Sequence, residues 1–247
     1  SDLQNLTDRP IMAKDVIPTT WTETGGGFFG AFNPVLGNYE DLNVNYEVYV
    51  SNGFDTGFSD TGLSGGRSSF KTDNNNDKAI VGRLAVSPRL NQEFGVSGYW
   101  GEYDTAAHDI TGVGFDSLFT VGSFEWINEY AYFDVEEGSS DSANFFQGAY
   151  SQLNYDFWPE FLNHSVLGRN FKDPKLTLVG RYDWALITDD SDSSIGDNEE
   201  FRYTLGFNYR PVDYFVFKME YQWNQTANET LERGDNEGFL TSMAIGF

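Results

Sequence analysis

The clearest pattern in the chain is a strict alternation of apolar and polar residues in two segments near its C-terminus. From Phe201 to Arg210 the odd positions are aromatic or aliphatic, whereas the even positions are charged, polar or small. The segment from Tyr214 to Gln225 repeats the alternation. Because successive side chains of a strand point to opposite faces, both segments are predicted to be β-strands with one apolar and one polar face.

The same alternation predicts further strands upstream. It is evident within 42–50, 80–86, 124–132 and 175–186, and weaker within 26–33, 93–103, 111–120 and 143–157. Residues 238–247 form another predicted strand, which ends on an aromatic residue. These segments give about eleven strands. The sequence therefore predicts an all-β protein with a single domain over residues 1–247.

The connections between the predicted strands alternate in length. Those at 87–92, 121–123 and 210–213 are short, whereas those at 51–77, 104–109, 135–142, 188–200 and 226–237 are long and rich in carboxylates. Barrels of the bacterial outer membrane have short periplasmic turns and longer external loops. The alternation therefore predicts which ends of the strands face outward, and the connection at 158–174 is unusually long for the periplasmic side.

These patterns predict a transmembrane antiparallel β-barrel, with about 11–12 strands in this chain, because a closed ring leaves no unpaired strand edge in the membrane. Bacterial single-chain barrels have an even number of strands. We therefore expect either one more strand within residues 1–25, or about five strands before Ser1 and a total near sixteen. In this arrangement the apolar faces contact lipid and the polar faces enclose water.

Composition narrows the range of partners. Aromatic residues make up 17% of the chain, yet no run of about 20 apolar residues, the length that a membrane-spanning helix needs, is present. The formal net charge of −23 argues against nucleic acid as a partner, since phosphate contacts require clustered Lys and Arg. The chain has no cysteine, which excludes disulfides and thiolate metal sites.

Ionisable residues on the polar faces form the main candidate site. In a channel such residues line a water-filled lumen and produce a field that sorts charged solutes. The alternative is that they form salt bridges that only keep a polar interior solvated. The predicted pore-lining residues are the cations Arg83, Arg181, Arg202, Arg210 and Lys218 and the anions Glu47, Glu125, Glu129, Asp183 and Glu220.

The connections between the predicted strands contain weaker candidates for functional residues. The long, glycine-rich segment 51–77 either folds into the lumen as a constriction, with Arg67 and Lys71 as its selectivity cations, or forms a disordered external loop. The acidic run from Asp189 to Glu200 is expected to be a solvated loop, bridged loosely by divalent ions to lipopolysaccharide. His108 and His164 have no partner in any motif, so we predict no catalytic residue, metal site or cofactor.

Several stretches resemble a known family: RPIMAKDVIPTT at 9–20, DFWPE at 156–160, LVGRYDW at 178–184, GFNYRP at 206–211 and FKMEY at 217–221. They are similar to the C-terminal two-thirds of the phosphate-selective porin O and P family. The resemblance implies a homotrimeric porin of about sixteen strands. Phosphate selectivity in this family relies on basic residues of the constriction and lumen wall, whereas this chain has as many inward anions as cations.

The predicted function is passive diffusion of small hydrophilic or charged solutes, including anions such as phosphate, through a barrel in the bacterial outer membrane. The barrel would contact outer-membrane lipid and lipopolysaccharide. One alternative is an outer-membrane barrel that acts as a scaffold or sleeve for a partner protein. Another is a secreted soluble β-sandwich that binds carbohydrate, which requires the aromatic strand faces to be buried against a second sheet.

Overall fold

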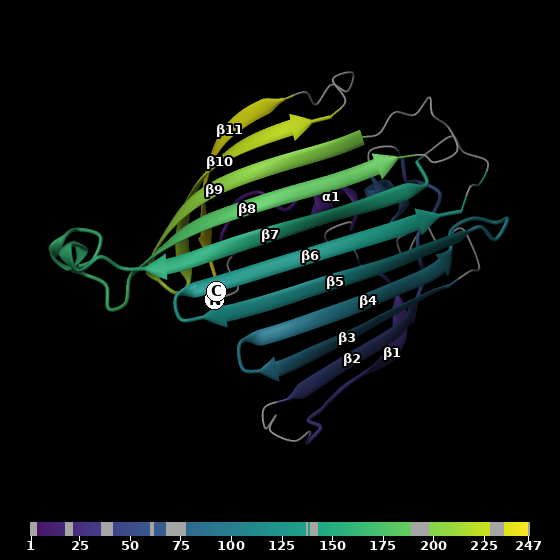
Figure 1. Ribbon diagram of the computed structural model, residues 1–247, viewed down its shortest axis with the longest axis horizontal. Helices are drawn as coiled ribbons and strands as arrows, with labels where there is room; N and C mark the ends of the chain where they lie inside the picture. The colour runs from purple at the N-terminus through teal and green to yellow at the C-terminus, as the bar shows by residue number, and fades with distance from the viewer. Residues whose placement is uncertain are drawn as a thin grey trace.

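The eleven predicted strands are all present and form one antiparallel sheet in chain order (Figure 1). The computed structural model describes residues 4–17, 22–35, 42–59, 62–67, 78–136, 138, 143–188, 198–227 and 235–246. The strands are β1 (Gly25–Phe32), β2 (Asn43–Ser51), β3 (Ala79–Arg89), β4 (Gln92–Glu102), β5 (Asp109–Val121), β6 (Phe124–Val135), β7 (Phe145–Phe157), β8 (Lys175–Thr188), β9 (Asn198–Val212), β10 (Phe215–Thr226) and β11 (Asn236–Ile245). The short helices are α1 (Met12–Asp15), η1 (Leu63–Gly66) and η2 (Glu160–His164).

Short turns join the strands at the end of the sheet predicted to face the periplasm. The turn after β5 lies where the sequence predicts it, and Gly122 adopts a positive φ of 59°. The turn expected over 210–213 is shorter than predicted, because β9 continues to Val212 and β10 begins at Phe215. The turn expected over 87–92 is shorter than predicted, because β3 continues to Arg89, which pairs with Gln92, and Asn91 supplies the left-handed residue. The connection from Trp158 to Pro174 is long, as predicted, and contains η2.

The convex face of the sheet is apolar and exposed. Figure 1 shows one curved layer with α1 on its concave side. Leu205 is 61% exposed and Tyr203 48% exposed, and both lie on the face predicted to be apolar. No second sheet covers this face within the described part of the chain, so the sandwich alternative is wrong.

The concave face is drier than predicted near the long connections. A cluster of buried apolar residues forms there from the ends of β3 to β8, from α1 and from Phe54, Phe58 and Leu63 of the β2–β3 connection. Phe54 lies with its ring centroid 5.3 Å from that of Tyr99 and 6.0 Å from that of Phe133. The expectation of a uniformly wet inner face is therefore wrong, because α1 and this connection bring their own apolar side chains onto the wall.

The sheet is open, with β1 and β11 as its two edges. In the described residues no helix has both the length and the apolar character needed to cross a membrane. Phe247, Lys71 and most of the acidic run from Asp189 lie outside the described residues.

Candidate functional site

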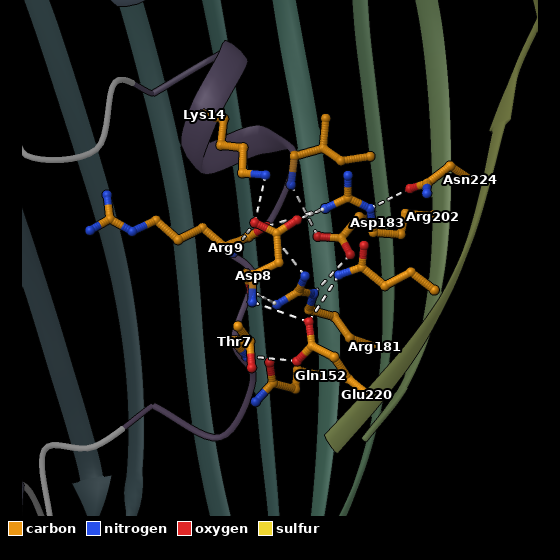
Figure 2. Close-up of polar contacts among 12 residues, drawn as sticks. Thr7, Asp8, Arg9, Lys14, Gln152, Arg181, Asp183, Arg202, Glu220 and Asn224 are labelled. Atoms are coloured by element: carbon orange, nitrogen blue, oxygen red, sulfur yellow. Dashed lines mark hydrogen bonds and ion pairs between the residues drawn. The ribbon is translucent and has the colours of Figure 1, made fainter. Parts of the chain in front are cut away.

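Residues 4–17, which we call the strap, lie against the concave face and form the centre of the candidate site (Figure 2). Strands β8, β9, β10 and β11 supply the side chains that form hydrogen bonds with it. Sequence analysis left residues 1–25 either as a strand or as a loop. The strap instead carries α1 and contacts the wall through backbone groups and Asp8.

Three of the predicted pore-lining cations bind the strap. Arg181 donates to the carbonyl oxygens of Asp8 at 3.0 Å and Arg9 at 3.3 Å. Arg202 pairs with the carboxylate of Asp8 at 2.8 Å, and Lys218 donates to the carbonyl of Leu6 at 3.1 Å. These cations therefore form hydrogen bonds and an ion pair with a segment of the same chain.

Two predicted anions on the same strands also bind the strap. Glu220 accepts the backbone N–H groups of Thr7 at 2.6 Å and Asp8 at 3.1 Å, and Asp183 accepts that of Ile11 at 3.3 Å. Asp183 also accepts from Arg181 at 2.8 Å, and both side chains of this pair are almost fully buried. A buried ion pair needs such additional hydrogen bonds, because its desolvation cost offsets much of the Coulomb gain.

Asp8 links the strap to the wall by its charge. Burial acts to raise the pKa of Asp8, but the hydrogen bond and charge of Lys14 and the charge of Arg202 outweigh it, so the pKa is lowered. The Lys14–Asp8 distance is 2.6 Å. The carboxylate therefore stays ionised at neutral pH and holds two cations together.

A second charged cluster lies on β3, β4 and β5. Arg83 contacts both carboxylate oxygens of Asp116, at 3.3 and 2.7 Å, and Glu93 at 3.0 Å. Gly95 makes room for this contact, because a Cβ at this position would lie 2.3 Å from Asp116 Oδ1. Glu47 stands directly opposite Arg83 in the β2–β3 register.

A recess with a volume of about 630 Å³ lies between the strap and strands β5 to β9. Glu125 accepts from Asn154 at 2.7 Å, and Glu129 is hydrogen-bonded to Tyr150. Arg210 also lines the recess but is only 9% exposed. The six carboxylates that line the recess are Asp8, Asp116, Glu125, Glu129, Asp156 and Asp213, and the three cations are Lys175, Arg181 and Arg210.

The residues predicted for a constriction are placed only in part. Phe54, Phe58 and Leu63 of the β2–β3 connection pack in the same apolar cluster as residues of α1 on the concave face. Arg67 is exposed and donates to the carbonyl of Ser64 at 2.8 Å. Lys71 is outside the described residues, so its role stays a prediction, as does that of the pore-lining set.

Sequence reasoning missed the strap, Asp116 and Glu93. Asp116 lies in a segment whose alternation of apolar and polar residues is weak. Asp8 lies outside the predicted strands, so the alternation could not identify it as a residue of the inner face. It also missed the partner of His108, whose Nδ1 lies 2.6 Å from Asp104 Oδ2, at a spacing of four residues. The described residues contain no group of His, Cys, Asp and Glu suited to hold a metal ion.

An antiparallel sheet with an apolar convex face and a charged concave face defines the class of outer-membrane β-strand proteins. The comparisons place the chain within this class. The family model described as phosphate-selective porin O and P matches residues 71–246, and the chain belongs to this family. No curated protein matches the sequence. Membership places the protein in the bacterial outer membrane as a porin, which is not an enzyme.

Proposed function

We propose that the sheet is the larger part of a closed barrel of about sixteen strands, which carries small hydrophilic solutes passively across the outer membrane. The observation that carries this proposal is the contrast between the two faces. Leu205 and Phe239 are exposed on the convex face, whereas Arg181, Asp183 and Glu220 lie on the concave face. Apolar side chains are stable in contact with lipid and charged side chains in contact with water, so the two faces fit a wall between lipid and a water-filled lumen.

The strap narrows the passage in this proposal, because it lies on the wall from β8 to β11. Its contact with β11 is the hydrogen bond between Thr7 Oγ1 and Ser242 Oγ, at 2.7 Å. Solutes would therefore pass beside the strap, along the recess. The porin family typically forms trimers, and we propose a homotrimer here as well.

The family name specifies phosphate as a solute. Selective passage of phosphate requires cations on the lumen wall that the solute can contact. Of the predicted inward cations, Arg83, Arg181, Arg202 and Lys218 are held by protein groups. We therefore propose diffusion of small hydrophilic solutes in general, without a phosphate site on the described part of the wall.

Planar-bilayer recording of the purified full-length protein tests the channel. We expect stepwise increases in conductance from material whose folded form migrates differently from its heat-denatured form on a gel. Folded trimers that give no conductance would reject the channel and favour the sleeve, whose lumen is filled by a partner protein.

A further inference from the structure

The β7–β8 connection, residues 158–174, is an ordered segment that turns apolar side chains outward. Its backbone forms several internal hydrogen bonds, including that from Leu162 to the carbonyl of Pro159 at 3.0 Å. Gly168 is buried within it, because a Cβ there would lie 2.3 Å from the carbonyl oxygen of Leu162. The large apolar side chains of the segment are nevertheless exposed, namely Phe161 (77%), Val166 (70%), Leu167 and Phe171.

The connection is attached to the convex face of the sheet. Trp158 stacks on Tyr209 with the ring centroids 6.3 Å apart, and the hydroxyl of Tyr209 donates to the carbonyl of Leu167. Tyr209 lies on the convex face, because its neighbour Asn208 points to the strap on the concave face. Figure 1 shows the connection projecting away from the sheet, beyond the ends of β7 and β8. It therefore lies on the outer side of the wall and not in the lumen.

Aromatic rings mark the part of the convex face from which the connection leaves. Phe124 and Tyr155 stack with their centroids 4.6 Å apart, and Tyr155 stacks on Phe157 at 5.5 Å. Leu176, which pairs with Phe157, is 6% exposed, whereas Leu178 on the same face is 48% exposed. Outer-membrane barrels have girdles of aromatic residues at both membrane interfaces. The connection therefore leaves the wall at the level expected for lipid headgroups.

The charges of the connection also fit a phospholipid surface. It carries two exposed cations, Arg169 and Lys172, and two exposed carboxylates, Glu160 and Asp173. The whole chain has 15 Lys and Arg residues against 38 Asp and Glu residues. Segments that lie in a membrane interface bind through buried apolar side chains and through attraction of Lys and Arg to anionic lipid. The connection thus lacks the acidic excess that would repel such a surface.

We propose that the β7–β8 connection is a lipid-binding segment, which docks on the phospholipid of the periplasmic leaflet. Its exposed aromatic and aliphatic side chains enter the boundary between headgroups and acyl chains, while Arg169 and Lys172 contact headgroup phosphates. This inference rests on the proposed orientation of the sheet in the membrane and is independent of conduction. It gives a role to a long connection at the end of the barrel where short turns are expected.

Fluorescent labels on single cysteines test the proposal in the full-length protein, because residues 1–247 contain no cysteine. A nitrobenzoxadiazole label at Val166→Cys is measured in vesicles of phosphatidylethanolamine and phosphatidylglycerol with a lipid that carries a doxyl quencher near its headgroup. The matched control is Ala106→Cys, which is exposed in the β4–β5 connection at the opposite end of the strands. We expect quenching by the lipid to be several-fold stronger at Val166 than at Ala106.

The apolar contribution is tested by Phe161→Ser combined with Phe171→Ser in the Val166→Cys background. Both side chains are exposed, so the variant should fold as the unmodified protein does. We expect the double variant to lose most of the lipid quenching, because the side chains that enter the membrane are removed. Unchanged quenching would overturn the proposal.

The charge contribution is tested by Arg169→Gln combined with Lys172→Gln. Docking on phosphatidylglycerol vesicles should weaken by about fivefold for each cation removed. Glu160→Gln combined with Asp173→Asn is the matched control, because it removes two charges of the opposite sign from the same segment. A loss of quenching in this control as large as that in the cation variant would overturn the proposal.

Three further outcomes are distinguishable. Quenching at Val166 by aqueous iodide and not by lipid would overturn the proposal, and so would protection from both quenchers, which is expected if a second copy of the chain covers the segment. A label at Leu205→Cys, on the convex face, checks the sheet with a lipid whose doxyl group lies deep in the acyl chain. Absence of quenching at Leu205 would reject the proposed orientation of the sheet, whereas quenching at Leu205 without quenching at Val166 would reject the lipid-binding segment alone.

Discussion

At the scale of the residue, most inward charges are partnered. The buried pair Arg181–Asp183 and the half-buried pair Arg83–Asp116 illustrate two kinds of partnership. The buried pair is supported by backbone groups of the strap, because removing two charges from water costs more than their attraction alone returns. The half-buried pair keeps contact with water and contributes less to stability. A charge on a strand therefore does not by itself indicate a solute contact.

Replacement of Gly95 by alanine should weaken the Arg83–Asp116 pair. The new Cβ would lie within 2.3 and 2.5 Å of the two carboxylate oxygens of Asp116, so the carboxylate must move away. We expect the free energy of unfolding to fall by about 1 kcal/mol, a value typical for loss of a partly exposed pair with some strain. Urea titration of the protein refolded in detergent micelles measures it.

Gly98→Ala provides the control on the same strand. A Cβ at Gly98 meets no heavy atom within 4 Å. This variant should keep the stability of the unmodified protein, and equal destabilisation of both variants would show that Asp116 is not the cause.

The pair of Asp104 and His108 predicts a pH response in the β4–β5 connection. The hydrogen bond to Asp104 raises the pKa of His108, although burial opposes the shift. A raised pKa means that this contribution to stability is fully present below the unfolded value, about 6.5. It is lost as the pH rises through the folded value. The imidazole shift followed by NMR should titrate above that value, and Asp104→Asn should lower the midpoint; identical midpoints would contradict the pairing.

At the scale of the element, the strap has no regular structure beyond α1, and its position depends on the sheet. Gly206 allows a close approach, because a Cβ there would lie 2.6 Å from Leu6 Cδ2. Gly62, with a φ of +131°, allows the β2–β3 connection to approach the carbonyl of Asp15. The strap is thus packed between the wall and that connection.

Engineered cysteines test whether the strap is docked, and the cysteine-free sequence makes the experiment clean. Thr7→Cys combined with Ser242→Cys should form a disulfide on mild oxidation, since the two hydroxyl oxygens lie 2.7 Å apart. The product is a closed loop that migrates faster on a non-reducing gel. Thr7→Cys with Ser97→Cys should not cross-link, because six strands separate β4 from β11. Equal cross-linking of the two pairs would indicate a mobile strap.

At the scale of the whole molecule, one row of directly paired positions crosses the concave face from β5 to β10. Asp116 pairs with Glu129, which pairs with Tyr150, and Tyr150 pairs with Asp183. Asp183 pairs with Arg202, and Arg202 with Asn224. This row gives the wall a polar belt at mid-strand, and the strap rests on its β8–β10 part.

The convex face should contact acyl chains in the assembled protein. Trp126 is 49% exposed on this face, so a variant that keeps Trp126 as its only tryptophan should lose most of its fluorescence in vesicles with brominated acyl chains. Efficient quenching by aqueous iodide instead would contradict the orientation of the sheet. A variant that keeps only Trp158, in the β7–β8 connection, is the comparison for a position outside the strands.

The alternation of residues determined the strands and their faces, because side-chain direction in a strand depends only on local geometry. The faces of the 201–210 and 214–225 segments could therefore be assigned without a structure, and the turn residues limited where the strands end. The partners of Arg181, Arg202 and Lys218 could not be assigned. They depend on a segment about 170 to 210 residues away in sequence, and on a strand register that no local pattern contains. Only the tertiary structure showed that much of the charged face binds the chain's own strap.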